Sequence, residues 1–392
     1  MHIQIADRLQ HTEEYYFSKK LSQIAELNKQ GKDIINLGIG SPDLMPPASV
    51  IETLVDEVKK PAGHGYQKYN GIPALREAIA EWYGKNYGVT LDADREILPL
   101  MGSKEGIMHV CMTYLQEGDE ALIPNPGYPT YRSAVQLSGA TAVPFELSAE
   151  NEWFPDLEKL ASQDLSKVKL MWINYPHMPT GARASFSFFK QLVAFAKKHS
   201  ILICHDNPYS FILNEEQISL LSVEGSRDVC IELNSFSKTY NMAGWRMGML
   251  VGAPDRIAEV LRFKSNMDSG MFYPLQVAAS KALTLNDAWH TEMNEVYRNR
   301  RVLAAELLKL LGCRFDAEQV GMFLWAHIPT EFDDGFALAD WVLDHARVFI
   351  TPGGIFGSQG NSYIRVSLCS TEEILNRAIE RIKSALALAS TQ

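Results

Sequence analysis

One lysine in this sequence stands among the hydroxyls and the guanidinium that a phosphorylated cofactor needs. Lys238 follows Ser235 and Ser237 and precedes Arg246 within the segment 234–248. A lysine amine can form a Schiff base with an aldehyde, and hydroxyls together with a guanidinium can hold a phosphate dianion by charge-assisted hydrogen bonds. The segment therefore predicts a site for a phosphorylated carbonyl compound.

The elements around this segment must position the lysine. The apolar runs 229–233 and 249–251 predict two buried strands, so Lys238 is expected on a polar turn between them. Gly244 and Gly248 flank Arg246, and glycines there allow the backbone to approach a ligand closely.

The pattern Ser-x-Ser-Lys followed by Gly-x-Arg-x-Gly resembles the lysine box of the class I/II aminotransferases, which are pyridoxal 5′-phosphate (PLP) enzymes of fold type I. The resemblance implies that Lys238 carries the PLP aldehyde and that Ser235, Ser237 and Arg246 hold the phosphate. An ordinary surface turn with a solvated lysine is the other interpretation of the box alone. Further cofactor contacts must therefore come from other segments.

A glycine turn earlier in the chain offers a second contact to the same phosphate. Residues 96–101 predict a strand, and Gly102, Ser103 and Lys104 open a helix. Unpaired N–H groups and the positive dipole end of a helix N-terminus attract an anion. A simple helix cap is the alternative interpretation of this triplet.

Two tyrosines are assigned by the resemblance. Prolines stiffen the segment 124–131, and the resemblance implies that Tyr128 stacks on the pyridine ring. Tyr66, five residues before Gly71, is implied to reach the cofactor phosphate of the neighbouring subunit, with Tyr69 as the second choice. From residue type alone, these tyrosines would be packing residues.

A carboxylate at a strand end is the next cofactor contact. Residues 201–206 predict a buried strand, and Asp206 lies at its carboxyl end, where open α/β sheets bind ligands. A carboxylate there can pair with a protonated pyridine nitrogen and keep the ring electron-withdrawing. Tyr209 is implied to donate to the phenolic oxygen of PLP.

The clearest departure from the family follows the predicted strand 168–173. The family pattern is Asn-x-Pro-x-Asn-Pro-Thr-Gly, and its second Asn donates to the phenolic oxygen. In this chain Asn174 is present, but Met178 occupies the second position and cannot donate. Asn174, His177 or a water are the alternatives for that donor. Without it, the proton of the lysine–PLP Schiff base should bind more tightly.

Two residues are implied to hold the substrate carboxylate. Arg365 lies among apolar neighbours in the predicted strand 363–367, and a buried arginine requires a partner. A bidentate grip on a carboxylate is one answer, and an internal salt bridge is the other. The backbone near Gly40, in a Gly-Ser-Pro-Asp turn, is implied to contact the same carboxylate, although a turn that crosses between domains is equally consistent.

Composition and charge limit the partners. The net charge of −10, without a basic stripe, argues against nucleic acid. No apolar run approaches the roughly 20 residues that a membrane-spanning helix needs, and the N-terminal segment lacks the pattern of a secretory signal. The five cysteines are widely spaced without a CxxC metal pattern, which favours reduced thiols in the cytoplasm and predicts no metal site.

The order of elements predicts an α/β protein, and the resemblance implies fold type I. We expect a large doubly wound α/β/α PLP-binding domain over residues 45–285 and a small α+β domain built from both termini, residues 1–44 and 286–392. A long helix is expected over 289–311, with charges such as Arg298, Arg300 and Arg301 solvated.

Together these segments predict a PLP-dependent aminotransferase of amino acid biosynthesis. It would move an amino group between an L-amino acid and a 2-oxo acid by a ping-pong mechanism, as a homodimer with shared active sites. The loop 266–274 is implied to lie against the partner's site and most resembles the branch containing diaminopimelate and alanine-type aminotransferases. A PLP-dependent carbon–sulfur β-lyase on the same fold and a non-catalytic PLP-binding or regulatory protein are the alternatives.

The substrate side chain is left open by the sequence. A dicarboxylic substrate needs a second cation, for which the candidates are Lys68, Lys104, Arg132 and Lys264. Otherwise the pocket is apolar, and the candidates for its lining are Tyr16, Tyr131, Tyr273 and Phe323.

Overall fold

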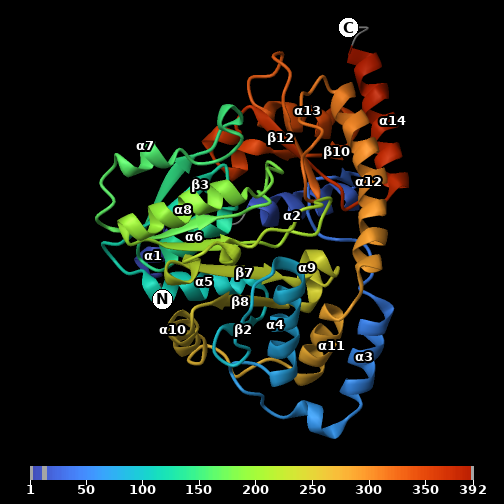
Figure 1. Cartoon of the computed structure of the whole chain (residues 1–392). Coiled ribbons are helices and arrows are strands. Elements are labelled where there is room, and N and C mark those ends of the chain that lie inside the picture. Colours follow the sequence, from blue (N-terminus) through green and yellow to red (C-terminus); the bar gives the residue numbers. More distant parts are fainter. Residues whose placement is uncertain (1–2, 11–15, 390–392) are drawn as a thin grey trace.

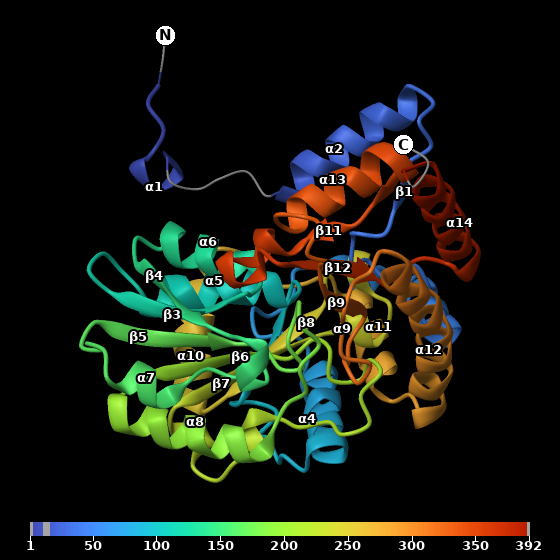
Figure 2. The same ribbon diagram turned by 90° about the horizontal axis from the view of Figure 1, so that it is seen from above.

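A seven-stranded sheet forms the centre of the protein in this computed structural model, which describes residues 3–10 and 16–389 (Figures 1 and 2). The strand order is β2-β8-β7-β6-β5-β3-β4, and β8 runs antiparallel to both of its neighbours while the others are parallel to one another. The strands are β2 (Ile97–Leu100), β3 (Glu120–Asn125), β4 (Thr141–Glu146), β5 (Val168–Ile173), β6 (Leu202–Asp206), β7 (Cys230–Ser235) and β8 (Gly248–Gly252). The carboxyl ends of the parallel strands therefore meet at one edge, where such sheets bind ligands.

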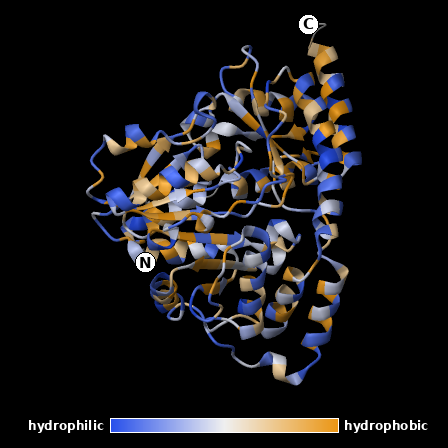
Figure 3. Ribbon diagram, viewed as in Figure 1, coloured by the Kyte–Doolittle hydropathy of each residue, from blue (hydrophilic) through white to orange (hydrophobic). Residues whose placement is uncertain are grey.

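Helices cover both faces of this sheet. In β5, Leu170 and Trp172 pack on the face of α5, α6 and α10, whereas Met171 and Ile173 pack on the face of α4, α8 and α11. A sheet buried on both faces has strands that are apolar throughout, and the central strands are mainly hydrophobic in Figure 3. The helices around it are α3 (Ala48–Val58), α4 (Pro73–Tyr87), α5 (Ser103–Tyr114), α6 (Pro129–Leu137), α7 (Leu157–Ala161), α8 (Phe186–His199), α10 (Pro254–Lys264) and α11 (Tyr273–Leu283).

A smaller unit combines segments from both ends of the described chain. Its three-stranded antiparallel sheet has the order β11-β12-β9, and β1 pairs in parallel with β10. One hydrophobic cluster joins Phe17 and Leu37 to Ile364 and Ile379. Figure 2 shows α2, α13 and α14 together beside the central sheet. The elements are α2 (Tyr16–Lys29), β1 (Ile35–Asn36), β9 (Phe323–His327), α13 (Gly335–Ala346), β10 (Val348–Phe349), β11 (Thr351–Pro352), β12 (Tyr363–Ser367) and α14 (Glu372–Ala389). The short helix α1 (Asp7–Gln10) instead lies beside α6 of the central unit (Figure 2).

The long helix α12 (Asp287–Leu310) runs along the side of the molecule and packs against α14 (Figure 1). The expectation that its arginines are solvated is wrong for Arg300, which is buried. Its guanidinium donates to both carboxylate oxygens of Asp43, at 2.6 and 2.8 Å, and to the Leu368 carbonyl oxygen at 3.1 Å. This bidentate pair ties the helix to the turn that contains Gly40.

The segment around Lys238 also differs from the expectation. The lysine lies not on an irregular turn but in the one-turn helix α9 (Phe236–Thr239), which directly follows β7. The Ser235 hydroxyl accepts a hydrogen bond from the Ser237 N–H at 3.1 Å and so caps the turn. The cap determines the direction in which the lysine leaves the strand.

Within the described residues, no helix is both long and apolar enough to cross a membrane. All five cysteines are buried and carry free thiols.

Candidate active site

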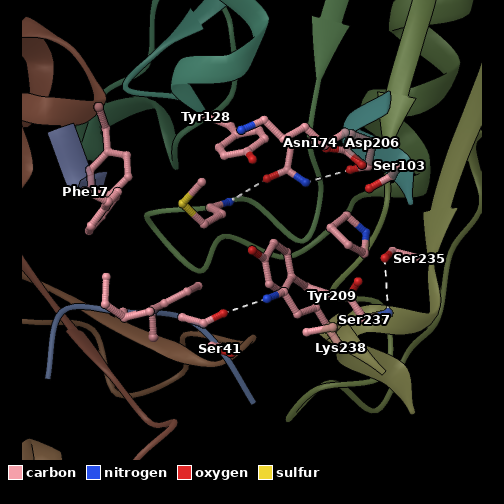
Figure 4. Close-up of a pocket in the computed structure, with 18 of the residues that line it drawn as sticks. Phe17, Ser41, Ser103, Tyr128, Asn174, Asp206, Tyr209, Ser235, Ser237 and Lys238 are labelled. Atoms are coloured by element: carbon pink, nitrogen blue, oxygen red, sulfur yellow. Dashed lines mark hydrogen bonds between the residues drawn. The ribbon is translucent and has the colours of Figure 1, made fainter. Parts of the chain in front are cut away.

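A cavity of about 500 Å³ lies at the carboxyl edge of the central sheet, where the smaller unit approaches it (Figure 4). Strand ends supply its polar side chains: Ser103 follows β2, Tyr128 follows β3, Asn174 follows β5 and Asp206 ends β6. The residues of its wall are Phe17, Leu21, Ile39, Gly40, Ser41, Ser103, Lys104, Tyr128, Tyr131, Asn174, Met178, Asp206, Pro208, Tyr209, Ser235, Ser237, Lys238, Ala243, Arg246, Phe323, Phe356 and Arg365.

The structure brings together every site residue predicted from the sequence except Gly102 and Tyr66. Gly102 lies directly behind the wall, against the Arg246 guanidinium. Tyr66 is 93% exposed and lies outside the cavity of its own chain, as does Tyr69.

Lys238 enters the cavity beside Tyr209 (Figure 4). Its Nζ donates a hydrogen bond to the Gly40 carbonyl oxygen at 2.6 Å. Burial lowers the pKa of this amine to about 8, and the Arg365 and Arg246 guanidiniums add to the effect while Cys369 opposes it. A neutral amine is therefore accessible near neutral pH, as a nucleophile or a general base requires.

Asp206 presents one open oxygen to the cavity. The Tyr131 hydroxyl donates to its Oδ2 at 2.9 Å, whereas its Oδ1 is buried without a hydrogen-bond partner among the described residues. Burial raises the pKa of Asp206 to about 6, and the Tyr131 hydrogen bond and His205 act in the opposite direction. A cationic N–H donor at Oδ1, such as a protonated pyridine nitrogen, would satisfy the orphaned atom.

A buried pair supports Asp206 from behind. The His205 ring donates from Nδ1 to Glu232 and from Nε2 to the Tyr175 carbonyl oxygen, both at 2.8 Å. Contacts at both ring nitrogens fix the orientation of the imidazole between Glu232 and the Tyr175 backbone. Glu232 also accepts from the hydroxyls of Tyr83 and Ser219, so the pair is well satisfied although neither side chain is exposed.

Hydroxyls and cations form a cradle for an anion at one end of the cavity. Gly102 has φ +87°, and a Cβ built on it would lie 2.0 Å from Arg246 Nη2, so only glycine leaves room for the guanidinium. Burial and the neighbouring Arg246 charge lower the pKa of Lys104. The Arg246 guanidinium donates to the carbonyl oxygens of Ala243 and Met101, and Ser235, Ser237 and Ser103 line the same wall. The cradle fits a phosphate dianion.

Met178 occupies the position where the family has an asparagine that donates to the phenolic oxygen, and its neighbours are Asn174 and His177. Asn174 donates from Nδ2 to the Asp206 carbonyl oxygen at 2.6 Å and accepts from the Met178 N–H at 2.8 Å. His177 does not line the cavity; its Nδ1 pairs with Thr180 Oγ1, and burial lowers its pKa to about 3. His177 is therefore no substitute for the missing amide, and Asn174 and Tyr209 are the polar side chains near this wall.

Arg365 is 4% exposed in the middle of β12. Its Nη2 donates to the Gly38 carbonyl oxygen at 2.7 Å, and its Nη1 lies 3.3 Å from Met178 Sδ, a weak acceptor. Aromatic rings surround the guanidinium: its Cζ lies 3.9 Å from the ring centroid of Phe323 and 4.7 Å from that of Phe356. An arginine held in this way is oriented for a carboxylate in the cavity.

Most of the cations that the sequence offered for the second carboxylate of a dicarboxylic substrate do not line the cavity of their own chain. Lys68 and Arg132 do not line it, and Lys264 is fully buried in an ion pair with Asp268 on α10. Of the predicted apolar lining, Tyr131 and Phe323 belong to the wall, whereas Tyr16 and Tyr273 do not.

The sequence interpretation missed the aromatic and aliphatic part of the wall. Phe17 and Leu21 come from α2, Ile39 from the turn before Gly40, and Phe356 from the segment before β12. Phe17 and Leu21 are four residues apart and so share one face of α2. Within the described residues, no group of three or more His, Cys, Asp or Glu side chains is arranged to hold a metal ion.

Comparisons with known proteins place the chain in a family. The family model for aminotransferase class I and II matches residues 32–382. The LL-diaminopimelate aminotransferase of Dehalococcoides mccartyi is 40% identical over 97% of this chain and 98% of its own. That of Moorella thermoacetica is also 40% identical, over 98% of this chain and 99% of its own. The substrate-bound BacF structure from Bacillus subtilis has a TM-score of 0.93 and 38% identity over 98% of each chain.

The fold and the cavity are those of a PLP-dependent enzyme of fold type I. The chain belongs to the class I and II aminotransferase family, and its activity is the PLP-dependent transfer of an amino group between an amino acid and a 2-oxo acid. The predictions of fold class, family, cofactor and transamination are thereby confirmed, including the resemblance to the diaminopimelate branch.

Proposed function

We propose that Lys238, Asp206 and Arg365 carry the transamination in the cavity at the carboxyl edge of the sheet. The observation that supports this most directly is the convergence of a deprotonatable amine and an open carboxylate oxygen on one cavity. When bound, PLP supplies an aldehyde that captures the amino group and a ring that accepts the electron pair released at the substrate Cα.

Lys238 is the general base and acid in this proposal. Its amine, with a pKa lowered to about 8, takes the proton from the substrate Cα and delivers it to the cofactor carbon that receives the amino group. The Gly40 carbonyl oxygen, 2.6 Å from Nζ, holds the amine in the cavity. This contact places the lysine next to the turn that is proposed to bind the substrate.

Asp206 and the cradle hold the cofactor. Asp206 Oδ1 would accept from the pyridine nitrogen and keep it protonated, while Tyr131 restrains the other oxygen. Tyr128 would cover the ring, and Tyr209 and Asn174 would hold its phenolic oxygen. The phosphate is assigned to a set of residues from three segments: Gly102, Ser103, Lys104, Ser235, Ser237 and Arg246.

The substrate carboxylate is assigned to Arg365 and the backbone at Gly40. The guanidinium keeps its orientation through the Gly38 carbonyl oxygen and the ring of Phe323, so little ordering remains to be done when the substrate binds. A side chain at Gly40 would place its Cβ 2.2 Å from the Phe323 ring, which explains the glycine. Both contacts come from the smaller unit, so the substrate is held between the two parts of the fold.

The molecule is proposed to act as a homodimer in which Tyr66 reaches the phosphate of the partner's cofactor. Tyr66, Met267 and Phe272 are large exposed side chains, and the segments that carry them touch: a Cβ on Gly270 would lie 2.5 Å from the Gln67 carbonyl oxygen. An exposed apolar group of this kind is typical of an interface, and a twofold copy would cover it.

The domain boundaries and the compartment complete the proposal. We divide the chain into a large PLP-binding domain over 45–285 and a small domain over 1–44 and 286–392, as the separate hydrophobic clusters support. Five buried free thiols support a reducing compartment, the cytoplasm.

The test of the proposed function is the chemical fate of Lys238. After incubation with PLP and reduction with borohydride, peptide mass mapping should find the cofactor attached to Lys238. Lys238→Ala should lose the attachment and lower kcat for any amino donor by at least about 1,000-fold. Lys190→Ala, which removes an exposed lysine on α8, is the matched control and should change neither result. Attachment elsewhere, or an active Lys238→Ala enzyme, contradicts the proposal.

A further inference from the structure

Each charged side chain of the cavity wall already has a role in the function proposed above. Among the described residues of the wall, its Lys, Arg, His, Asp and Glu side chains are Lys104, Asp206, Lys238, Arg246 and Arg365. Four of them serve the cofactor and Arg365 serves the substrate α-carboxylate. A substrate with a second ionised group therefore finds no counter-charge in the wall of this chain.

Lys104 is the residue that the sequence allowed in either role. Burial lowers the pKa of its ammonium, and the neighbouring Arg246 guanidinium adds to this effect. Lys104 therefore lies at the end of the cavity that forms the proposed phosphate cradle, next to Ser103 at the start of α5. A lysine in that place neutralises a phosphate and not the far end of an amino acid.

The opposite side of the cavity is apolar. Phe17 and Leu21 lie four residues apart on α2 and so share one face of the helix, and Ile39 joins them from the turn before Gly40. Figure 4 shows Phe17 across the cavity from Asp206. The Phe17 ring centroid is 5.5 Å from Arg365 Cζ, so this wall starts directly beside the carboxylate site.

Met178 extends the apolar wall. The family pattern has an amide at this position, whereas here a buried thioether points to Arg365, with Sδ 3.3 Å from Nη1. The substitution removes a polar group from the space between the cofactor site and the carboxylate site. Thioether, phenyl and alkyl groups therefore line this part of the cavity.

We propose that the amino donor of this enzyme carries an apolar side chain, aromatic or branched aliphatic, which packs on Phe17, Leu21 and Ile39. The inference rests on the proposed function and narrows its substrate class. It separates this chain from its curated relatives, which are named for LL-diaminopimelate, a molecule with a second ammonium and carboxylate. Burying such an unpaired charged end is unfavourable, whereas an apolar end gains by leaving water.

In the proposed homodimer, the partner chain is the other source of a charged side chain for the cavity. In the loop that carries Tyr66 and Tyr69, Lys68 is an exposed cation. If it entered the partner's cavity it would favour acidic donors. The experiment therefore includes Lys68→Met in the intact PLP-loaded protein.

The test measures the first half of the reaction, in which the donor becomes its 2-oxo acid and the cofactor takes up the amino group, without any acceptor. The cofactor absorbance of the loaded enzyme reports the rate constant for each donor. The donors are L-phenylalanine, L-leucine, L-alanine, L-glutamate, L-aspartate and LL-diaminopimelate. We expect L-phenylalanine or L-leucine to exceed L-alanine by at least about 10-fold in rate constant per donor concentration, and the charged donors to fall below L-alanine.

Two variants on one helix test the wall itself. Leu21→Ala should reduce the preference for L-leucine and L-phenylalanine over L-alanine by about 5- to 10-fold, because the isobutyl group no longer packs on the donor side chain. Leu27→Ala removes the same side chain from α2 outside the cavity and should leave the preference and the rates unchanged. The comparison needs no large buried residue to be removed.

The outcomes separate the two proposals. If glutamate, aspartate or LL-diaminopimelate reacts faster than L-alanine, the apolar-donor proposal is overturned, and loss of that rate in Lys68→Met would assign the charge to the second copy. If no donor changes the cofactor spectrum, the proposed function fails and the substrate proposal fails with it. Equal preference in Leu21→Ala and the native chain also contradicts the assigned wall.

Discussion

The Arg246 guanidinium occupies the space that a side chain on Gly102 would need. A Cβ built on Gly102 would lie 2.0 Å from Arg246 Nη2 and 2.7 Å from Cζ, and the glycine has φ +87°. The two residues come from different strands, since Gly102 follows β2 and Arg246 precedes β8, which are antiparallel neighbours. The proposed phosphate cradle therefore depends on one missing side chain.

Gly102→Ala should weaken PLP binding without unfolding the protein. The added methyl group strains the left-handed backbone and displaces the guanidinium, so we expect the Kd for PLP to rise by at least about 10-fold. Gly84→Ala is the matched control, because nothing lies within 4 Å of a Cβ there and the residue is inside α4. It should leave the Kd unchanged. Fluorescence titration with PLP measures both, and equal affinities would contradict the assigned cradle.

Tyr131→Phe should move the acidic limb of the activity profile to higher pH. The Tyr131 hydroxyl stabilises the ionised form of Asp206 and opposes the burial that raises its pKa to about 6. Without that hydrogen bond the pKa rises further, so the carboxylate protonates at a higher pH on acidification. The measurement is kcat/KM against pH. Tyr114→Phe, whose hydroxyl binds Glu259 outside the cavity, should keep the native profile.

Met178→Asn should change how the bound cofactor titrates. An amide at this position can donate to the phenolic oxygen of PLP, which the thioether cannot do. The added donor favours the deprotonated chromophore, so the pH at the midpoint of its absorbance change should fall. Met178→Leu keeps the wall apolar and should leave the midpoint near the native value. An unchanged midpoint in Met178→Asn means that another group already supplies the donor.

Two inactive variants should restore each other if the subunits share their sites. Neither Lys238→Ala nor Tyr66→Ala is expected to be fully active alone. A mixed dimer regains one native site, built from Lys238 of one chain and Tyr66 of the other. Equal mixing after dissociation should therefore recover at most about a quarter of the native activity. Mixing that yields only the sum of the two separate activities would place both residues in one chain's site.

His177 should make the protein less stable as the pH falls. Burial lowers its pKa to about 3, whereas an unfolded chain has the ordinary value of about 6.5. Below pH 6.5 the unfolded state therefore binds a proton at this imidazole and the folded state does not. The free energy of unfolding falls as the pH is lowered. Between pH 7 and pH 5 this group should lower the free energy of unfolding by about 2 kcal/mol.

Urea unfolding of the native chain and of His177→Gln at both pH values measures this contribution. The variant should show a loss smaller by about 2 kcal/mol, whatever its absolute stability. His345→Gln, at an exposed position on α13, is the control and should retain the native pH dependence. A loss in His177→Gln equal to that of the native chain would contradict the prediction.

The elements with strong periodicity could be predicted from the sequence, and the short ones could not. Residues 168–173 are apolar apart from Lys169, and β5 has the predicted bounds. The helix around Lys238 has a single turn, too short for any hydrophobic period, and its existence depends on the Ser235 cap. An apolar run identifies a strand because it is buried on both faces, whereas a cap is visible only in coordinates.

Contacts between distant segments limited the prediction of the site. Arg300 looked solvated because its partner Asp43 is 257 positions away. The cofactor residues could be assigned because the chain resembles a family whose motifs have fixed roles, and not because spacing alone determined them. Phe17 illustrates the converse: no motif marks it, and only the packing of α2 shows that it lines the cavity.

The division of the site between two sets of segments has a consequence for protein synthesis. Strands β2 to β8, which carry the groups assigned to the cofactor, are translated well before β12 delivers Arg365. Domains fold as units in the order in which they emerge from the ribosome. The proposed PLP site can therefore form before the site for the substrate carboxylate is complete. A nascent chain at that stage would bind PLP and yet be unable to catalyse transamination.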